Sequence, residues 1–242
     1  MGLGVAVPLL AIPCINRPDL LERLLASIDV IPDRLLVIDN SPDGLDFAVP
    51  DRLADALYID RPPTNLGVAG SWNHAITTHA HLDWWAIANA DTEFAPGDLE
   101  RLAAEMAKGG SRWVGMNGDW RLMGLSFEAV ERVGLFDGNY FPIYCEDADY
   151  ERRCSLAGVP WYFIDGGATH VGSAAINSDI RYARANARTY PANLAYYQRK
   201  WGGGHRGGER FTTPFDSGAS VASWTLDIRR LRSLAWDRDG KP

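Results

Sequence analysis

The chain has 242 residues, an ordinary globular composition and a formal net charge of −7. This acidic balance argues against a protein built to coat nucleic acid. The three cysteines, Cys14, Cys145 and Cys154, are scattered and odd in number, so the sequence predicts neither a disulfide framework nor a zinc finger.

No targeting or membrane-spanning segment is evident. The N-terminus lacks a basic stretch followed by a long apolar core, and no apolar run approaches the roughly 18 residues of a membrane span. We therefore expect a cytoplasmic protein, and leave open a peripheral membrane contact through the basic residues near the C-terminus.

The first hundred or so residues alternate between short apolar runs and amphipathic segments. The pattern predicts strands at 5–12, 35–38, 56–59 and 83–88, and helices at 18–28, 68–80 and 96–108. Such alternation is typical of a parallel, doubly wound α/β sheet.

The second half is less regular. It predicts strands at 113–117, 122–126 and 161–164, and helices at 127–133, 146–157, 177–201 and 219–236, with a glycine-rich loop at 202–208. We expect a catalytic domain at 1–175 and a helical C-terminal extension at 176–242 that packs on it.

Two polar side chains follow the strand predicted at 83–88. Asn89 and Asp91 are alternate residues, which share a face on extended chain. Ligands of open α/β sheets bind where the strands end, and paired oxygen ligands suit a hard divalent cation that carries a phosphate-bearing substrate. The alternative is a polar strand end that caps the next helix.

Two further features fit a nucleotide site. Asp39 ends the second strand, where its carboxylate can accept a hydrogen bond from a nucleobase, although a turn-forming aspartate is the alternative. In the turn at 65–73, Gly67 and Gly70 let the backbone approach a phosphate or a ribose.

An acidic cluster at 146–149 begins a predicted helix. Such a position can hold a carboxylate ionised and aim it into a cleft, as a general base must be. Helix capping is the alternative, but three acids in four residues exceed what a cap needs. His170 can complete a metal site with Asp91, and mixed nitrogen and oxygen ligands suit Mn²⁺ somewhat better than Mg²⁺.

Taken in order, these motifs resemble family 2 glycosyltransferases of the GT-A fold. The resemblance covers roughly residues 5–175, and its motifs lie at 12–18, 37–41, 65–73, 89–91, 133–137, 146–149 and 169–170. It implies a GT-A-type, Rossmann-like and mostly parallel sheet flanked by helices. It also implies transfer of a sugar from a nucleoside diphosphate donor to an acceptor hydroxyl in one inverting displacement.

The resemblance further implies roles for particular residues. Asp147 matches the catalytic base, and Asp91 and His170 match the ligands of a divalent cation, Mn²⁺ or Mg²⁺. Asn89 stands where the family usually has an aspartate; its amide removes one negative charge, which weakens metal binding or leaves Asn89 with a ribose role. The donor is expected to contact Pro13, Arg17, Asp39, Asn65, Gly67, Gly70, Asn73, Asn89 and Ala90.

The sugar and the acceptor are expected to contact Trp120, Met123, Gly124, Tyr144 and Glu146. We further hypothesise that the glycine-rich loop closes over the diphosphate with His205 or Arg206, a plain linker being the alternative. A UDP- or dTDP-sugar donor is favoured because Asp39 suits uracil or thymine; the acceptor type stays open.

Two other functions remain open on the sequence. A sugar-phosphate nucleotidyltransferase could share such a sheet, but no basic, glycine-rich triphosphate loop follows the first strand. A non-catalytic sugar-nucleotide or carbohydrate-binding module would not need the acids at 146–149.

Overall fold

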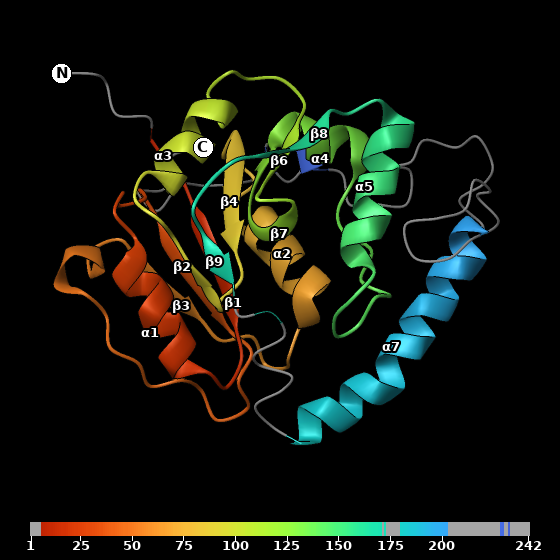
Figure 1. Cartoon of the computed structure of the whole chain (residues 1–242), viewed down its shortest axis with the longest axis horizontal. Helices are drawn as coiled ribbons and strands as arrows, with labels where there is room; N and C mark the ends of the chain where they lie inside the picture. Colours follow the sequence, from red (N-terminus) through yellow and green to blue (C-terminus); the bar gives the residue numbers. More distant parts are fainter. Residues whose placement is uncertain (1–5, 171, 173–179, 203–227, 230–231, 233–242) are drawn as a thin grey trace.

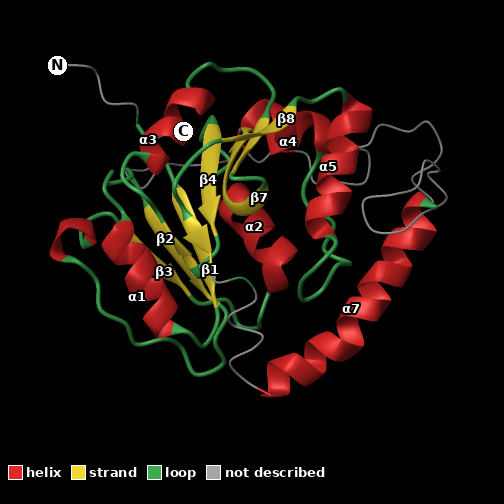
Figure 2. Cartoon of the chain, viewed as in Figure 1, coloured by secondary structure: helices red, strands yellow, loops and turns green. Residues whose placement is uncertain are grey.

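A computed structural model describes residues 6–170, 172, 180–202, 228–229 and 232. Its centre is a seven-stranded sheet with the order β3-β2-β1-β4-β7-β6-β8, and helices lie on both faces of this sheet (Figure 1). A long C-terminal helix runs along one side of the molecule (Figure 2). The predicted fold class, a mostly parallel α/β sheet with a helical C-terminal part, is confirmed.

The first half forms the parallel part of the sheet. Strands β1 (Leu10–Cys14), β2 (Leu35–Asp39), β3 (Leu57–Asp60) and β4 (Trp84–Ala88) pair in parallel. The helices between and after them are α1 (Pro18–Ser27), the 3-10 turn η1 (Asp51–Leu53), α2 (Gly67–Thr78) and α3 (Asp98–Met106). β1 begins later than predicted, because Pro8 has no N–H to donate to a neighbouring strand.

The second half adds β6 (Trp113–Met116), β7 (Asp119–Ser126) and β8 (Trp161–Ile164), with α4 (Phe127–Val133) and α5 (Glu146–Ala157). β7 lies antiparallel to both β4 and β6, so the sheet is mixed. It starts at Asp119 rather than at the predicted residue 122. Asn117 and Gly118 explain the difference, since both have positive φ, as a tight hairpin turn requires.

A second, small sheet pairs β5 (Thr92–Glu93) with β9 (Thr169–His170), and α7 (Ile180–Trp201) ends the described fold. Most of the helix predicted at 219–236 and most of the predicted glycine-rich loop lie outside the described residues; Ile228, Arg229 and Arg232, which are described, are helical. None of the helices in the described ranges combines the length and the hydropathy that a membrane crossing requires.

Apolar side chains on successive strand residues build two cores, one on each face of the sheet. Leu10 and Ile12 of β1 pack with α1 and α3, whereas Leu9 and Ala11 pack with α2, α4 and α5. Because successive side chains of a strand point to opposite faces, a sheet covered on both sides needs the unbroken apolar runs seen in the sequence.

Four buried charged side chains join α7 to α5; we call Asp137, Asp149, Arg153 and Lys200 the charge cluster. Lys200 Nζ lies 2.8 Å from Asp137 Oδ2 and 2.6 Å from Asp149 Oδ1, and Arg153 Nε lies 2.8 Å from Asp149 Oδ2. Burial opposes ionisation of Asp137, but Lys200 outweighs it and lowers the pKa of this carboxyl. Two cations thus balance two carboxylates at the C-terminal end of α7.

Candidate active site

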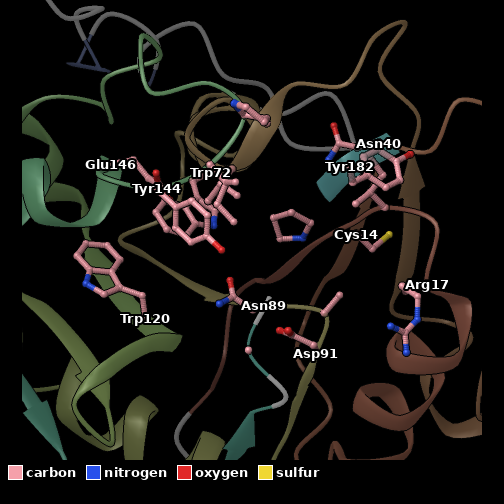
Figure 3. A pocket seen from close by; sticks show the side chains of 18 of the residues that line it. Cys14, Arg17, Asn40, Trp72, Asn89, Asp91, Trp120, Tyr144, Glu146 and Tyr182 are labelled. Atoms are coloured by element: carbon pink, nitrogen blue, oxygen red, sulfur yellow. The ribbon is translucent and has the colours of Figure 1, made fainter. Parts of the chain in front are cut away.

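A cavity of about 360 Å³ opens at the carboxyl ends of β1 and β4 (Figure 3). This is where open α/β sheets bind their ligands. Segments far apart in sequence meet around it: the end of β1, the start of α2, the turn after β4, the start of β7, the start of α5 and the first turns of α7. Of the residues predicted from the sequence, it is lined by Pro13, Arg17, Asn65, Gly67, Asn89, Ala90, Asp91, Trp120, Tyr144, Glu146, Asp147 and His170.

Asp91 and His170 meet because β5 pairs with β9. Thr92 lies opposite His170 in this pair, which places the preceding Asp91 beside the imidazole. His170 Nε2 is 3.0 Å from Asp91 Oδ1, and His170 Nδ1 is 3.7 Å from Asp119 Oδ2. The hydrogen bond that the His170 imidazole donates to Asp91 raises the pKa of His170.

The pair fits a divalent cation that shares its coordination with a substrate. Across the described ranges, no group of three or more His, Cys, Asp or Glu side chains is arranged to hold a metal. Mg²⁺, however, is usually held by one or two carboxylates together with substrate phosphates and water, rather than by an all-protein cage. One carboxylate and one imidazole, both at the cavity wall, are therefore a sufficient protein share.

Two arginines bring positive charge to the same region. Arg17 Nε donates to Asp19 Oδ1 at 2.7 Å, and Arg121 Nε donates to Asp119 Oδ1 at 2.7 Å. These hydrogen bonds raise the pKa of both guanidinium groups, and the charge of Asp91 adds to the effect. Arg121 was not among the predicted residues, although its place two residues after Asp119 on β7 puts both side chains on one face.

Asp147 reaches the cavity because α5 begins at Glu146, after a sharp turn. Tyr144 and Cys145 both have positive φ, 80° and 77°, in this turn. Asn193 of α7 contacts the segment just before this turn, because its Nδ2 donates to the carbonyl oxygen of Ile143 at 2.9 Å. Asp147 Oδ1 accepts the N–H of Ala148 at 2.7 Å, so this carboxylate stands at the helix N-terminus, where the dipole favours negative charge.

Several predicted donor residues lie elsewhere. Asp39 is buried at the end of β2, where its carboxylate accepts the N–H groups of Ser41 at 3.0 Å and Leu45 at 2.7 Å. Burial would raise the pKa of Asp39, but these hydrogen bonds and Arg61 lower it. Asp39 thus orders the loop after β2, and its neighbour Asn40 lines the cavity instead.

Gly70 and Asn73 lie within α2, away from the cavity lining. Asn73 exchanges two hydrogen bonds of 2.8 Å with the backbone of Phe136, which fastens α2 to the segment after α4. The structure therefore gives Asn73 a packing role, and its donor contact stays a prediction.

Gly124 and Met123 on β7 also point away from the cavity. A Cβ atom at Gly124 would lie 2.7 Å from Met106 Sδ of α3, and Met123 Sδ accepts Trp113 Nε1 at 3.1 Å. Both residues belong to the packed faces of the sheet and are not among the residues that line the cavity, so their part in the sugar pocket stays a prediction. His205 and Arg206 lie outside the described residues.

Gly67 is where α2 begins and where the chain comes close to the turn before α5. Its φ is +67°, and a Cβ atom would lie 2.8 Å from the carbonyl oxygen of Pro142. That oxygen also accepts the N–H of Val68 at 2.8 Å. A side chain here therefore meets both backbone strain and backbone overlap.

We expect Gly67→Ala to lower the free energy of unfolding by more than about 1 kcal/mol, since alanine is strained at positive φ. Gly138→Ala is the matched control, because nothing lies within 4 Å of a Cβ there and no positive φ is needed. Urea denaturation of the two variants checks the prediction, and equal stability would contradict it.

Comparison with known proteins places this cavity in a family. The family model for Glycosyl transferase family 2 matches residues 10–144. The chain therefore belongs to glycosyl transferase family 2, as the motifs predicted, and its mostly parallel sheet agrees with the GT-A-type fold.

Two curated relatives are similar to part of the chain. A galactofuranosyl glycosyltransferase of Leishmania donovani is 30% identical over 149 residues, covering 49% of this chain and 34% of that protein. An uncharacterized glycosyltransferase of Mycobacterium bovis is 31% identical over 123 residues, covering 51% of this chain and 53% of that protein. The matches thus span about a third to a half of the relatives' length. A crystal structure of S. aureus TarS aligns over 60% of this chain and 54% of that chain, with 12% identity and a TM-score of 0.43.

Proposed function

We propose that the chain is an inverting glycosyltransferase that moves a sugar from a nucleoside diphosphate donor to an acceptor hydroxyl. The observation that carries this proposal is a single cavity with two chemically different ends. Arg17 lies at one end, Glu146 at the other, and Asp91 between them on the cavity floor (Figure 3). Asp147 follows Glu146 directly and lines the same cavity.

The arginines that line the cavity suit the diphosphate. Arg17 and Arg121 both belong to the lining, and each donates a hydrogen bond to a neighbouring carboxylate. Guanidinium groups bind phosphate oxygens through charge-assisted hydrogen bonds. The donor we favour is a UDP- or dTDP-sugar, and the name of the Leishmania relative adds a galactofuranosyl donor to those worth testing.

A divalent cation, Mn²⁺ or Mg²⁺, bound by Asp91 and His170 would neutralise the charge that develops on the leaving diphosphate. Asn89 lies beside Asp91 at the cavity floor (Figure 3). Its backbone carbonyl accepts the N–H of Thr92 at 3.1 Å, which fixes the turn that carries Asp91. The side chain of Asn89 is a neutral amide, so the carboxylate of this turn comes from Asp91. The amide of Asn89 suits a ribose hydroxyl.

Asp147 acts at the opposite end as the general base. Its carboxylate takes the proton of the acceptor hydroxyl while the acceptor oxygen attacks the anomeric carbon of the sugar. Because Arg17 lies at one end of the cavity and Asp147 follows Glu146 at the other, the acceptor attacks opposite the departing diphosphate. A single displacement of this kind inverts the anomeric configuration.

The test is to incubate the protein with nucleotide sugars and Mn²⁺, with and without hydroxyl acceptors, and to measure the products. Acceptor-dependent release of the nucleoside diphosphate would support the proposal. Release of pyrophosphate from a sugar phosphate and a nucleoside triphosphate would instead identify a nucleotidyltransferase. Binding of nucleotide sugars without turnover on any acceptor would indicate a binding module.

A further inference from the structure

Three residues that line the cavity each carry a buried polar side-chain atom with no hydrogen-bond partner in the described part of the chain. The atoms are Trp72 Nε1 of α2, Glu146 Oε2 of α5 and Asn186 Oδ1 of α7. An unpaired buried polar group costs about 1–3 kcal/mol, so native proteins pair nearly all of them. Three such atoms, brought to one cavity by three separate helices, indicate that a ligand supplies the missing partners.

The chemistry of the three atoms defines this ligand. The indole N–H of Trp72 only donates, and the amide oxygen of Asn186 only accepts. Glu146 is 4% exposed, and burial together with the neighbouring Asp147 raises its pKa well above the usual value. A neutral carboxyl group can both donate and accept. Hydroxyl groups, which also do both, are the complement of this set.

Aromatic surface beside these atoms adds an apolar wall. The rings of Trp72 and Trp120 are stacked, with centroids 5.5 Å apart and an interplanar angle of 14°. Both side chains line the cavity (Figure 3). An apolar wall with a few convergent polar atoms is how binding pockets fix the orientation of a small ligand. A hydroxylated ring, polar at its edge and less polar on its faces, matches both properties.

The position of Asn186 along α7 indicates which part of the substrate this hydroxylated ring is. One turn earlier, the Tyr182 hydroxyl accepts a hydrogen bond from Asn16 Nδ2, close to the Arg17 end of the cavity. One turn later, the Tyr190 ring packs edge-on against Tyr144, with centroids 5.3 Å apart, close to the base. Asn186 therefore lies between the diphosphate end and Asp147. In the proposed reaction, the transferred sugar must lie in this region between the diphosphate and the general base.

We propose that Trp72, Glu146 and Asn186 form the subsite that recognises the hydroxyl groups of the transferred sugar. This inference rests on the proposed function. Asn186 and Glu146 both lie beyond the segment that matches the family model, residues 10–144.

The test compares a nucleotide with its sugar derivatives by isothermal titration calorimetry in the presence of Mn²⁺. UDP is the reference, and UDP-glucose and UDP-galactose are the probes. Asn186→Leu keeps the size of the side chain but removes the accepting oxygen. We expect it to weaken the better-bound UDP-sugar about tenfold, the equivalent of one hydrogen bond of about 1.4 kcal/mol, and to change UDP affinity less than about twofold.

Two further variants sharpen this comparison. Asn186→Asp keeps an accepting oxygen, so the ratio of UDP to UDP-sugar dissociation constants should stay near the wild-type value even if the added charge weakens both. Ala187→Leu places the same new side chain on the exposed surface of α7 and should leave the ratio unchanged. Glu146→Leu should lower the preference for the UDP-sugar in the same way as Asn186→Leu.

The outcomes separate the subsite from the proposed function. If wild-type protein binds UDP and UDP-sugars but Asn186→Leu and Glu146→Leu leave the ratio unchanged, the subsite is overturned and the proposed function stands. Equal weakening of UDP and UDP-sugar would overturn it too, by assigning these residues to the nucleotide. If wild-type protein binds none of the probes, the proposed function fails and the subsite fails with it.

Discussion

Replacing Asp147 with asparagine should lower the rate of sugar transfer by about 10²–10⁴-fold, the usual contribution of a general base. Asparagine has nearly the same size but cannot take up the acceptor proton. Because Arg17 and Asp91, which are proposed to hold the diphosphate and its metal ion, are untouched, the dissociation constant of the nucleotide sugar should change less than about twofold. Single-turnover kinetics and calorimetry measure the two quantities separately.

The matched control is Glu128→Gln, which neutralises an exposed acid in the first turn of another helix, α4. It should leave both transfer and donor binding unchanged. If Asp147→Asn instead loses donor binding together with activity, or lowers the melting temperature substantially, then Asp147 has a structural role at the start of α5 and the proposed mechanism lacks its base.

Replacing Lys200 with methionine should destabilise the protein by about 3–5 kcal/mol, because it leaves a buried negative charge without its partner. Lys200 is fully buried and forms ion pairs with both Asp137 and Asp149. The ion pair of Arg153 described above is with Asp149. For a chain of this size, the expected fall in melting temperature is about 6–20 °C. Differential scanning calorimetry measures it.

Lys108→Met is the control, since Lys108 pairs with Glu105 at the exposed surface, where such pairs contribute about 0–1 kcal/mol. The double variant Lys200→Met/Asp137→Asn should be less destabilised than Lys200→Met alone, because it also removes one of the uncompensated charges. A loss below about 1 kcal/mol for Lys200→Met would show that water or a rearrangement satisfies the carboxylates, and that the charge cluster does not hold α7 in place.

The pH dependence of this pair has a definite sign. Lys200 lowers the pKa of Asp137 in the folded protein, so the stability from this pair is complete above the ordinary aspartate pKa and is lost as pH falls through the lower, folded value. Lys200→Met should therefore show less loss of stability on acidification than the wild-type protein.

Local signals in the sequence predicted much of the fold. The predicted bounds of α4, α5 and β8 agree with the structure, because their ends carry clear local signals. Ser126 caps α4 by accepting the N–H of Ala129, and Gly158 takes the left-handed conformation that ends α5. The starts of β1 and β7 were misplaced, because the effects of Pro8 and of the Asn117-Gly118 turn were overlooked.

The candidate site was predictable only where it follows strand ends and helix starts. Asn89 and Asp91 line the cavity because they directly follow β4, and Asp147 does so because it begins α5. Trp72 and Asn186 were missed, since no local pattern tells a packing residue on α2 or α7 from one that faces a ligand.

Asp39 was predicted to bind the base from its place at a strand end, and that role stays a prediction. Its carboxylate accepts the backbone N–H groups of Ser41 and Leu45, as in the turn-forming alternative. Which hydrogen bonds a side chain makes within its own loop depends on the folded path of that loop, which composition and spacing do not define.

The most direct test of the central claim is a thermal-shift panel of UDP, dTDP, GDP and CDP, each with EDTA, Mg²⁺ or Mn²⁺. A ligand that binds only the native state at about 100 times its dissociation constant adds about 2.7 kcal/mol of stability, which is a rise of about 5–10 °C here. A metal-assisted glycosyltransferase predicts such a rise with UDP or dTDP, larger with Mn²⁺ and lost in Asp91→Ala. The absence of a shift with every nucleotide and metal would contradict the account.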